Sequence, residues 1–354
     1  MSGYIWYSFG SDKTGPRLAE ALGFESGKKT PNFEDYDIVI GFGCKAKDEI
    51  GQIPAVTTGD LRILNHPDKV NLNRDKVHTL ERLRDAEIGT PGMVTRQERS
   101  PQDFYEAIRE GLNNGVLDFP ILGQSRTHNG PTFFCYTLED VQAACLTKDS
   151  SVEYFRSFCV GTEFRIHVMR DMALCAQIKT LSENPQEQTL RALKDELTKK
   201  ANKADKSINL NSDCDWVLGQ LVPELLRGPS QMLRSVGRGW LLEEVDINQI
   251  PGPVVTEAIN ALEAVDLDMG AVSITFDEAV ARVTNITTAP AINNSEMGCY
   301  VGAIQEFMET GPKVRNKPAA KKVETASPEL IARFTRKLRE VEAGKLEKLL
   351  KLLE

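Results

Sequence analysis

The stretch Thr162-Glu163-Phe164-Arg165-Ile166-His167-Val168 alternates polar or charged side chains with apolar ones over most of its length. Alternation with a period of two is typical of a β-strand that buries one face. It places Arg165 and His167 together on the other face. A second strand-like run, 172–179, follows directly and ends at Lys179. We therefore expect two neighbouring strands, the first with Arg165 and His167 on one face and the second ending at Lys179.

The composition is that of an ordinary soluble globular protein. The chain has 354 residues, 41% of them apolar and 27% charged, which at roughly 150 residues per domain suggests two or three packed units. No apolar run approaches the ~20 residues that a membrane-spanning helix needs, and the first residues do not resemble a secretory signal. We expect a cytoplasmic protein without a membrane partner. The net charge of −8 argues against nucleic acid as a partner of the whole molecule.

Cysteine and histidine residues are scattered along the chain. The seven cysteines include no CxxC pair, and the four histidines include no HExxH motif. Structural zinc sites usually show such paired spacing, so the sequence predicts no dedicated transition-metal site. Most of the cysteines are expected to be buried as small apolar side chains.

Changes in composition divide the chain into segments. Residues 1–70 begin with a β-α-β pattern and predict a small α/β domain. Residues 71–310 alternate short strands with helices, among them a predicted helix over Asp75–Glu87 and another over Cys299–Glu309. A polar, helix-prone insertion interrupts this region at about 181–235. Residues 311–326 contain two prolines and five basic residues, a composition typical of a linker. A Ser-Pro pair then begins a predicted helix over 327–354.

Four motifs follow one another between residues 73 and 310. They are Asn73-Arg74-Asp75-Lys76 with Ile88-Gly89-Thr90-Pro91, Phe119-Pro120-Ile121-Leu122-Gly123-Gln124 with the loop to Gly130, the strand pair 162–179, and the segment 266–290. In this order and spacing they resemble the ATP-grasp superfamily, and most of all the RimK-like carboxylate–amine ligases, including forms carried by tailed phages. The resemblance implies an α/β fold with two α+β lobes after a small pre-ATP-grasp domain, residues 1–70. In a phage-encoded protein, the cytoplasm would be that of the host.

The resemblance also implies a chemistry. In this superfamily ATP lies between the two lobes and transfers its γ-phosphate to a substrate carboxylate, and an amine then attacks the acylphosphate to give an amide. The protein mainly positions the reactants and neutralises phosphate charge. Lysine and arginine side chains serve the phosphates, and acidic residues on the last two strands hold magnesium.

The basic positions of the family are retained in part. Lys76 matches a lysine near the entrance of the nucleotide site, and Lys179 matches the basic residue that ends a strand of the second lobe. Arg165 matches the arginine that faces the phosphates or the acyl group, and His167 shares its strand face as a second candidate catalytic residue. The alternative for Arg165 and His167 is an exposed strand face with a surface salt bridge.

The nucleotide side departs from the family pattern. Gln124 stands where the family usually has a lysine, so it offers hydrogen bonds but no charge. Arg126 is expected to supply the missing cation, and His128 and Gly130 to form the loop that covers the phosphates. A flexible surface hairpin is the alternative for this loop.

The hinge segment departs as well. Ser157 replaces the usual glutamate before the segment that binds adenine. Phe158 and Cys159 follow it, and we expect them to bind adenine through main-chain groups and apolar contact.

The positions that bind magnesium in the family depart most from the family pattern. Ser273, Asn285 and Thr287 stand where the family would have aspartate, glutamate and asparagine. Neutral hydroxyls and amides hold Mg²⁺ poorly without a carboxylate, so we expect these positions not to bind the metal. Asp277 and Glu278 lie between the two strands and are interpreted as turn-forming residues.

Three functions are compatible with these observations. The first hypothesis is a pseudoenzyme that uses the ATP-grasp scaffold as a binding or assembly module, with ATP as the expected cofactor and little use of magnesium. The alternative is an active ATP-dependent ligase that forms an amide or peptide-like bond. A weaker alternative is an anion-binding or nucleic-acid-binding protein that uses the former phosphate site.

The predicted C-terminal helix carries an apolar stripe. Ile331, Phe334, Leu338 and Val341 follow a 3-4-3 spacing, with further leucines at 346, 349 and 353. Such a stripe is too long to remain in water, so the helix must pack on the rest of the chain or pair with another copy. A further protein partner is a third candidate.

We predict a homo-oligomer whose contacts include this helix. Light scattering should give a larger mass per particle for the full chain than for a version that ends at Thr325, after correction for the residues removed. Particles with the same number of chains in both versions would show that the helix does not contribute to assembly.

Overall fold

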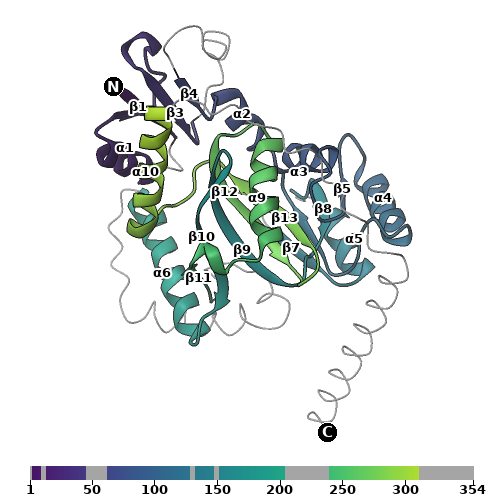
Figure 1. Ribbon diagram of the computed structural model, residues 1–354. Coiled ribbons are helices and arrows are strands. Elements are labelled where there is room, and N and C mark those ends of the chain that lie inside the picture. Colours follow the sequence, from purple (N-terminus) through teal and green to yellow (C-terminus); the bar gives the residue numbers. More distant parts are fainter. Residues whose placement is uncertain are drawn as a thin grey trace. The chain divides into compact units, whose positions relative to one another are not determined.

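The computed structural model describes residues 2–8, 13–44, 62–127, 132–146, 151–203 and 239–310, with the side chains of 196–203 left out. The chain divides into two compact units, Met1–Gly311 and Pro312–Glu354, and the described residues all belong to the first unit (Figure 1). The predicted linker and C-terminal helix, and the second half of the predicted insertion, lie outside the described residues. The first half of that insertion forms helix α6 (Pro185–Lys203).

The N-terminal sheet is parallel, with the order β2-β1-β3-β4. Two helices contribute to its buried core, in which Ile5, Leu18 and Ile38 meet Tyr300 and Ile304. Helix α1 is close to these strands in the sequence, whereas α10 lies at the far end of the described residues. The core of the N-terminal sheet is therefore completed by residues about 300 positions later, such as Tyr300 and Ile304. The elements are β1 (Gly3–Tyr7), β2 (Glu25–Gly27), β3 (Ile38–Phe42), β4 (Arg62–Leu64), α1 (Thr14–Leu22) and α10 (Asn294–Thr310).

The second sheet is antiparallel, with the order β5-β8-β6-β7. Two helices cover one of its faces, because Ile121 and Phe155 on the strands pack against Phe104, Ile108 and Val141. The opposite face carries Gln124. The elements are β5 (Met93–Thr95), β6 (Ile121–Gln124), β7 (Thr132–Cys135), β8 (Tyr154–Ser157), α4 (Pro101–Asn113) and α5 (Leu138–Leu146).

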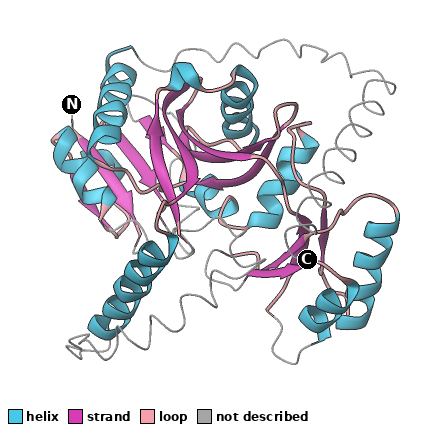
Figure 2. Ribbon diagram, turned by 90° about the horizontal axis from the view of Figure 1, so that it is seen from below, coloured by secondary structure: helices cyan, strands magenta, loops and turns pink. Residues whose placement is uncertain are grey.

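The third sheet is the largest and is antiparallel throughout, with the order β11-β10-β9-β12-β13. Helix α9 packs on the face that carries Phe164, Ile166 and Val168, and Figure 2 shows strands in magenta with their helices in cyan. The other face carries Arg165, so the predicted alternation is present. The elements are β9 (Thr162–Met169), β10 (Met172–Leu181), β11 (Trp240–Val245), β12 (Met269–Phe276), β13 (Ala281–Thr287) and α9 (Gly252–Ala264).

Short helices complete the described part of the unit. The sheets and the helices that cover them give the mixed α/β architecture expected from the sequence. No helix among the described residues combines the length and apolar character needed to cross a membrane. The remaining elements are α2 (Pro67–Leu72), α3 (Lys76–Asp85) and the 3₁₀ turns η2 (Phe33–Asp35) and η5 (Ile247–Gln249).

The sequence placed the start of α10 at Cys299, and the structure begins this helix five residues earlier, at Asn294. Asn293 and Glu296 explain the difference. Asn293 Oδ1 accepts a hydrogen bond from the backbone N–H of Glu296 (2.9 Å), and Glu296 Oε2 accepts one from the backbone N–H of Asn293 (2.9 Å). This reciprocal pair is a capping box.

Asn65 joins the N-terminal sheet to the five-stranded sheet. It follows β4 directly and is fully buried at a φ of 52°. Its Oδ1 accepts hydrogen bonds from the backbone N–H groups of Asp268 (2.8 Å) and Met269 (2.9 Å), and its Nδ2 donates to the carbonyl of Met269 (2.7 Å). One side chain thus satisfies three backbone groups at the start of β12, and asparagine also tolerates the left-handed backbone.

We predict that Asn65→Ala lowers the free energy of unfolding by about 2–4 kcal/mol, because it leaves buried backbone groups without partners and keeps alanine at a positive φ. Asn65→Gly should recover only the part that arises from backbone strain. Asn113→Ala, at the exposed end of α4, should change stability by less than about 0.5 kcal/mol. Urea denaturation measures all three, and equal values for Asn65→Ala and Asn113→Ala would contradict the assignment.

Candidate nucleotide site

The polar face of the five-stranded sheet brings together basic residues predicted from the sequence. Arg165 on β9 pairs in register with Gln177 on β10 and with Ser273 on β12. Lys179 lies two residues after Gln177, so it shares the face of Arg165. Lys179 Nζ lies 2.5 Å from Glu163 Oε1. Arg165 and Lys179 thus share a sheet face, but the charge of Lys179 is already paired.

Arg165 differs from Lys179 because it makes no ion pair with any carboxylate that the structure describes. Burial lowers the pKa of its guanidinium, and the smaller effects of Tyr300 and Glu296 oppose this. A largely buried cation without a counter-ion costs free energy. The alternative of a surface salt bridge therefore describes Lys179 better than Arg165, which is available to an anionic ligand.

His167 shares this face but is fully buried beneath α10. Its Nδ1 lies 3.0 Å from the hydroxyl of Tyr300, and its Nε2 lies 3.6 Å from Glu296 Oε1. Burial, followed by the charge of Arg165, lowers the pKa of the imidazole from 6.5 to about 3. His167 was expected to act on the substrate, but a neutral side chain with no exposed surface does not support that role.

Lys76 is positioned by the start of α3. Asp75 caps this helix by accepting hydrogen bonds from the backbone N–H groups of Val77 (3.0 Å) and His78 (3.2 Å), which leaves Lys76 in the first turn. Burial, and then the nearby charge of Arg156, lower the pKa of the Lys76 ammonium. Within the described ranges, neither cation is paired with a carboxylate. Two cations close enough to disfavour each other provide an arrangement that an anion would stabilise.

Gln124 connects this pair of cations to the second sheet. Its Oε1 accepts hydrogen bonds from Arg156 Nε (3.0 Å) and from the hydroxyl of Tyr154 (2.9 Å), and its Nε2 donates to Thr132 Oγ1 (3.2 Å). Gln124 pairs with Tyr154 across β6 and β8, and Arg156 lies two residues after Tyr154 on the same face. Gln124 therefore orients the guanidinium of Arg156.

The cation beside Gln124 is Arg156, whereas Arg126, the residue expected to supply a cation for the nucleotide, has another partner. Arg126 instead forms an ion pair with Asp75, with Nη2 at 2.6 Å and Nε at 2.9 Å from Asp75 Oδ2. This hydrogen bond raises the pKa of Arg126. Asp75 both caps α3 and pairs with Arg126, so a carboxylate already balances the charge of Arg126. Arg156 was missed, although the alternation in β8 could have indicated it.

Aromatic side chains lie on and next to the second sheet. Phe158 packs against Phe134, with ring centroids 5.3 Å apart, and Phe134 packs against Tyr136 at 4.8 Å. Thr132 on β7 pairs in register with Gln124 on β6. Phe134 lies two residues after Thr132, so Phe134 and Gln124 lie on the same face of the sheet. Cys159 is buried next to Phe158. Phe158 is thus near other aromatic rings, as an adenine-binding surface requires, while Phe134 was not predicted.

Ser273, Asn285 and Thr287 lie together at the positions where the family pattern has metal ligands. Ser273 and Asn285 are partners across β12 and β13, and Asn285 Nδ2 donates a hydrogen bond to Thr287 Oγ1 (3.1 Å). These side chains offer neutral oxygens only, and the amide and hydroxyl of two of them already bond to each other. They do not fit the magnesium site that the fold family implies.

The acidic residues of the next turn do not replace these ligands. Asp277 accepts hydrogen bonds from two backbone N–H groups of the turn, at 3.2 and 2.7 Å, and forms an ion pair with Arg282 at 2.7 Å. Glu278 has a φ of 71°. Both residues shape the turn, as the sequence indicated. His128 and Gly130, which were expected to cover the phosphates, lie outside the described residues.

Comparison with known proteins identifies the fold. No family model and no curated protein matches the sequence. Among solved structures, the ATP-grasp ligase PsnB with a minimal precursor matches with 13% identity and a TM-score of 0.53, over 86% of this chain and 98% of that one. The D-alanine–D-alanine ligase of Bacillus anthracis with ATP matches with 12% identity and a TM-score of 0.51, over 86% of this chain and 92% of that one. A RimK-domain ATP-grasp protein of Sphaerobacter thermophilus matches with 12% identity and a TM-score of 0.51, over 87% of this chain and 100% of that one.

These three neighbours share one architecture, and each is covered almost completely by this chain. The chain has the ATP-grasp fold. At such low identity the likeness concerns the fold, so the role of each side chain rests on the contacts that it makes in this structure.

We predict that Lys76→Met makes the ligand-free protein more stable at neutral pH by about 0.5–2 kcal/mol, because it removes a largely buried charge without a partner. Lys179→Met is the matched control, since it removes a lysine that forms an ion pair with Glu163, and it should destabilise the protein. Chemical denaturation of the two variants measures both values. A loss of stability in both would contradict the unpaired state of Lys76.

Proposed function

We propose that this chain is a divergent ATP-grasp protein that binds the phosphates of ATP through protein cations and acts as a binding or assembly module. The observation that carries this proposal is a contrast between two parts of one site. Lys76, Arg156 and Arg165 are kept free of described carboxylates, while the three metal positions contain none. The chain therefore has features suited to a polyphosphate but not to its usual magnesium ions.

The cations and aromatic rings suggest how a nucleotide would bind. Lys76 and Arg156 would share a phosphate oxygen or two neighbouring ones, as lysine and arginine commonly do. Gln124 would hold the Arg156 guanidinium in place rather than contact phosphate itself. Phe158, with Phe134 beside it, would provide the apolar surface for adenine.

Magnesium is the point at which this chain differs from its neighbours. One structure of PsnB was determined with a minimal precursor, Mg and ADP. Mg²⁺ is usually bound through one or two carboxylates in addition to phosphate oxygens. With Ser273, Asn285 and Thr287 in place of acidic ligands, ATP should bind here with little help from the metal, and phosphoryl transfer that relies on magnesium should be slow.

An active ligase is the second candidate, and Arg165 favours it. This residue lies without a described counter-ion at the position that the resemblance assigns to the acyl or phosphate group. A guanidinium there would stabilise charge that develops during transfer. Release of ADP in the presence of a carboxylate and an amine would support this alternative.

We expect calorimetry with the full chain to show ATP binding whose affinity changes less than tenfold (about 1.4 kcal/mol) when magnesium is added. Arg156→Gln and Lys76→Met should each weaken binding at least tenfold, because each removes a charge from the phosphates. Arg126→Gln is the matched control and should leave the affinity nearly unchanged, since Asp75 already holds Arg126.

The converse experiment introduces the missing ligands. The triple substitution Ser273→Asp, Asn285→Glu and Thr287→Asn should create a magnesium-dependent gain in ATP affinity of tenfold or more. A gain of that size in the unmodified chain would argue for the active ligase. No ATP binding at all, with or without magnesium, would overturn the proposed function.

A further inference from the structure

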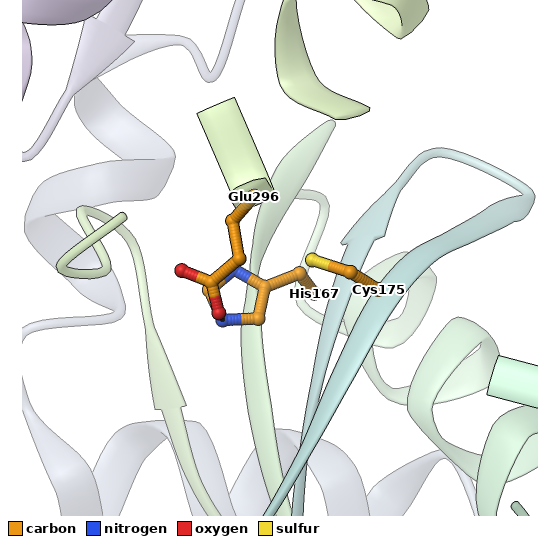
Figure 3. A group of neighbouring side chains, drawn as sticks. All are labelled: His167, Cys175 and Glu296. Carbon is orange, nitrogen blue, oxygen red and sulfur yellow. Dashed lines mark ion pairs between the residues drawn. The ribbon is translucent and has the colours of Figure 1, made fainter. Parts of the chain in front are cut away.

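A buried cluster beneath α10 contains three metal-ligating side chains that lie far apart in the sequence. His167 comes from β9, Cys175 from the adjacent β10, and Glu296 from the first turn of α10. Their ligand atoms all lie within 4.8 Å of one another. Figure 3 shows the carboxylate of Glu296 beside the imidazole ring of His167, with the sulfur of Cys175 near the other end of the His167 side chain.

The cluster contains acceptor atoms without donors. His167 Nε2 and Glu296 Oε1 are buried and have no hydrogen-bond partner among the described residues, and their side chains expose 0% and 2% of their surface. Gln177 Oε1, on the same face of β10 as Cys175, is a third such atom. Buried polar atoms in native proteins nearly always have partners. A single cation would serve His167 Nε2 and Glu296 Oε1 at once.

We propose that His167, Cys175 and Glu296 bind one zinc ion beneath α10. Imidazole nitrogen, thiolate sulfur and carboxylate oxygen are the three ligand types that zinc prefers. Around a zinc ion with bonds of about 2.0–2.3 Å, ligand atoms lie roughly 3.3–3.8 Å apart. The observed 3.6 Å between His167 Nε2 and Glu296 Oε1 matches this spacing, and the sulfur of Cys175 lies within 4.8 Å of the ligand atoms of both residues.

The surroundings orient the proposed ligands. Tyr300 lies 3.0 Å from His167 Nδ1, so a proton on Nδ1 leaves Nε2 with the lone pair that a metal needs. Glu296 uses Oε2 to cap α10 and keeps Oε1 for the ion. Cys299 lies three residues after Glu296 on α10 and is exposed, so solvent reaches this helix close to the cluster.

The proposed ion would join a helix to a sheet. His167 and Cys175 belong to neighbouring strands of the five-stranded sheet, and Glu296 belongs to the helix that also covers the N-terminal sheet. The ion would therefore stabilise the packing of this helix on the sheet. It uses none of the residues assigned to nucleotide or magnesium, so it stands independently of the proposed function.

The test is a titration of the full chain with Co²⁺, after chelator treatment under reducing conditions. We expect one Co²⁺ per chain, a charge-transfer band from thiolate to cobalt, and the strong visible bands of a tetrahedral site. Zn²⁺ should then bleach these bands, because it binds such ligands more tightly than Co²⁺. The melting temperature of the metal-free chain should also rise when Zn²⁺ is added.

Variants of the cluster make the test specific. Cys175→Ser should lose the charge-transfer band, and Glu296→Gln should bind Co²⁺ at least tenfold more weakly. Glu296→Gln keeps an oxygen that can cap α10, so it preserves a folded variant if Cys175→Ser fails to fold. Cys145→Ser is the matched control, since it removes a buried cysteine from α5, and it should keep the full spectrum. The zinc site would be overturned if the bands were absent from the unmodified chain. It would also be overturned if Cys175→Ser and Glu296→Gln both gave bands as strong as those of the unmodified chain.

Discussion

The alternation of side chains along β9 is the constraint on which the rest of this molecule depends. This strand is central in a five-stranded sheet, and its two faces carry different kinds of side chain. Phe164 and Ile166 bury one face against α9, while Arg165 and His167 point to the other. A shift of one residue in register would exchange these faces and place two basic side chains in an apolar core. The buried core therefore also fixes the position of the charged groups.

Much of the fold followed from the sequence because its signals were local and periodic. The strands around Arg165 and Lys179, the helix that begins at Lys76 and the turn at Asp277 all depend on residues near one another in the chain. The ordered motifs then indicated the ATP-grasp fold as a whole. The start of α10 was missed because Asn293 and Glu296 form a capping box that apolar periodicity does not reveal.

The candidate site was less predictable because it depends on pairing between distant residues. Arg126 seemed suitable beside Gln124, but Asp75, 51 positions away, neutralises it. Arg156 takes that place only because β6 and β8 are neighbours in the sheet. His167 was expected to be a catalytic residue because it shares a strand face with Arg165, whereas α10, contributed by residues more than a hundred positions later, covers it completely. The cluster with Cys175 and Glu296 has no recognisable spacing in the sequence for the same reason.

The hydrogen bonds of Asn65 have a consequence for the order of events during synthesis. They connect Asn65, directly after β4, to Asp268 and Met269, which lie 203 and 204 positions further along the chain. The core of the N-terminal sheet is also incomplete until α10 has been synthesised. At roughly 5–20 residues per second, a ribosome needs on the order of 10–45 s to make the intervening chain. During that interval, the apolar residues of β1 and β3 lack part of their final cover. The first sheet to be synthesised is therefore among the last to be completed, and its apolar residues need another form of protection from water until then.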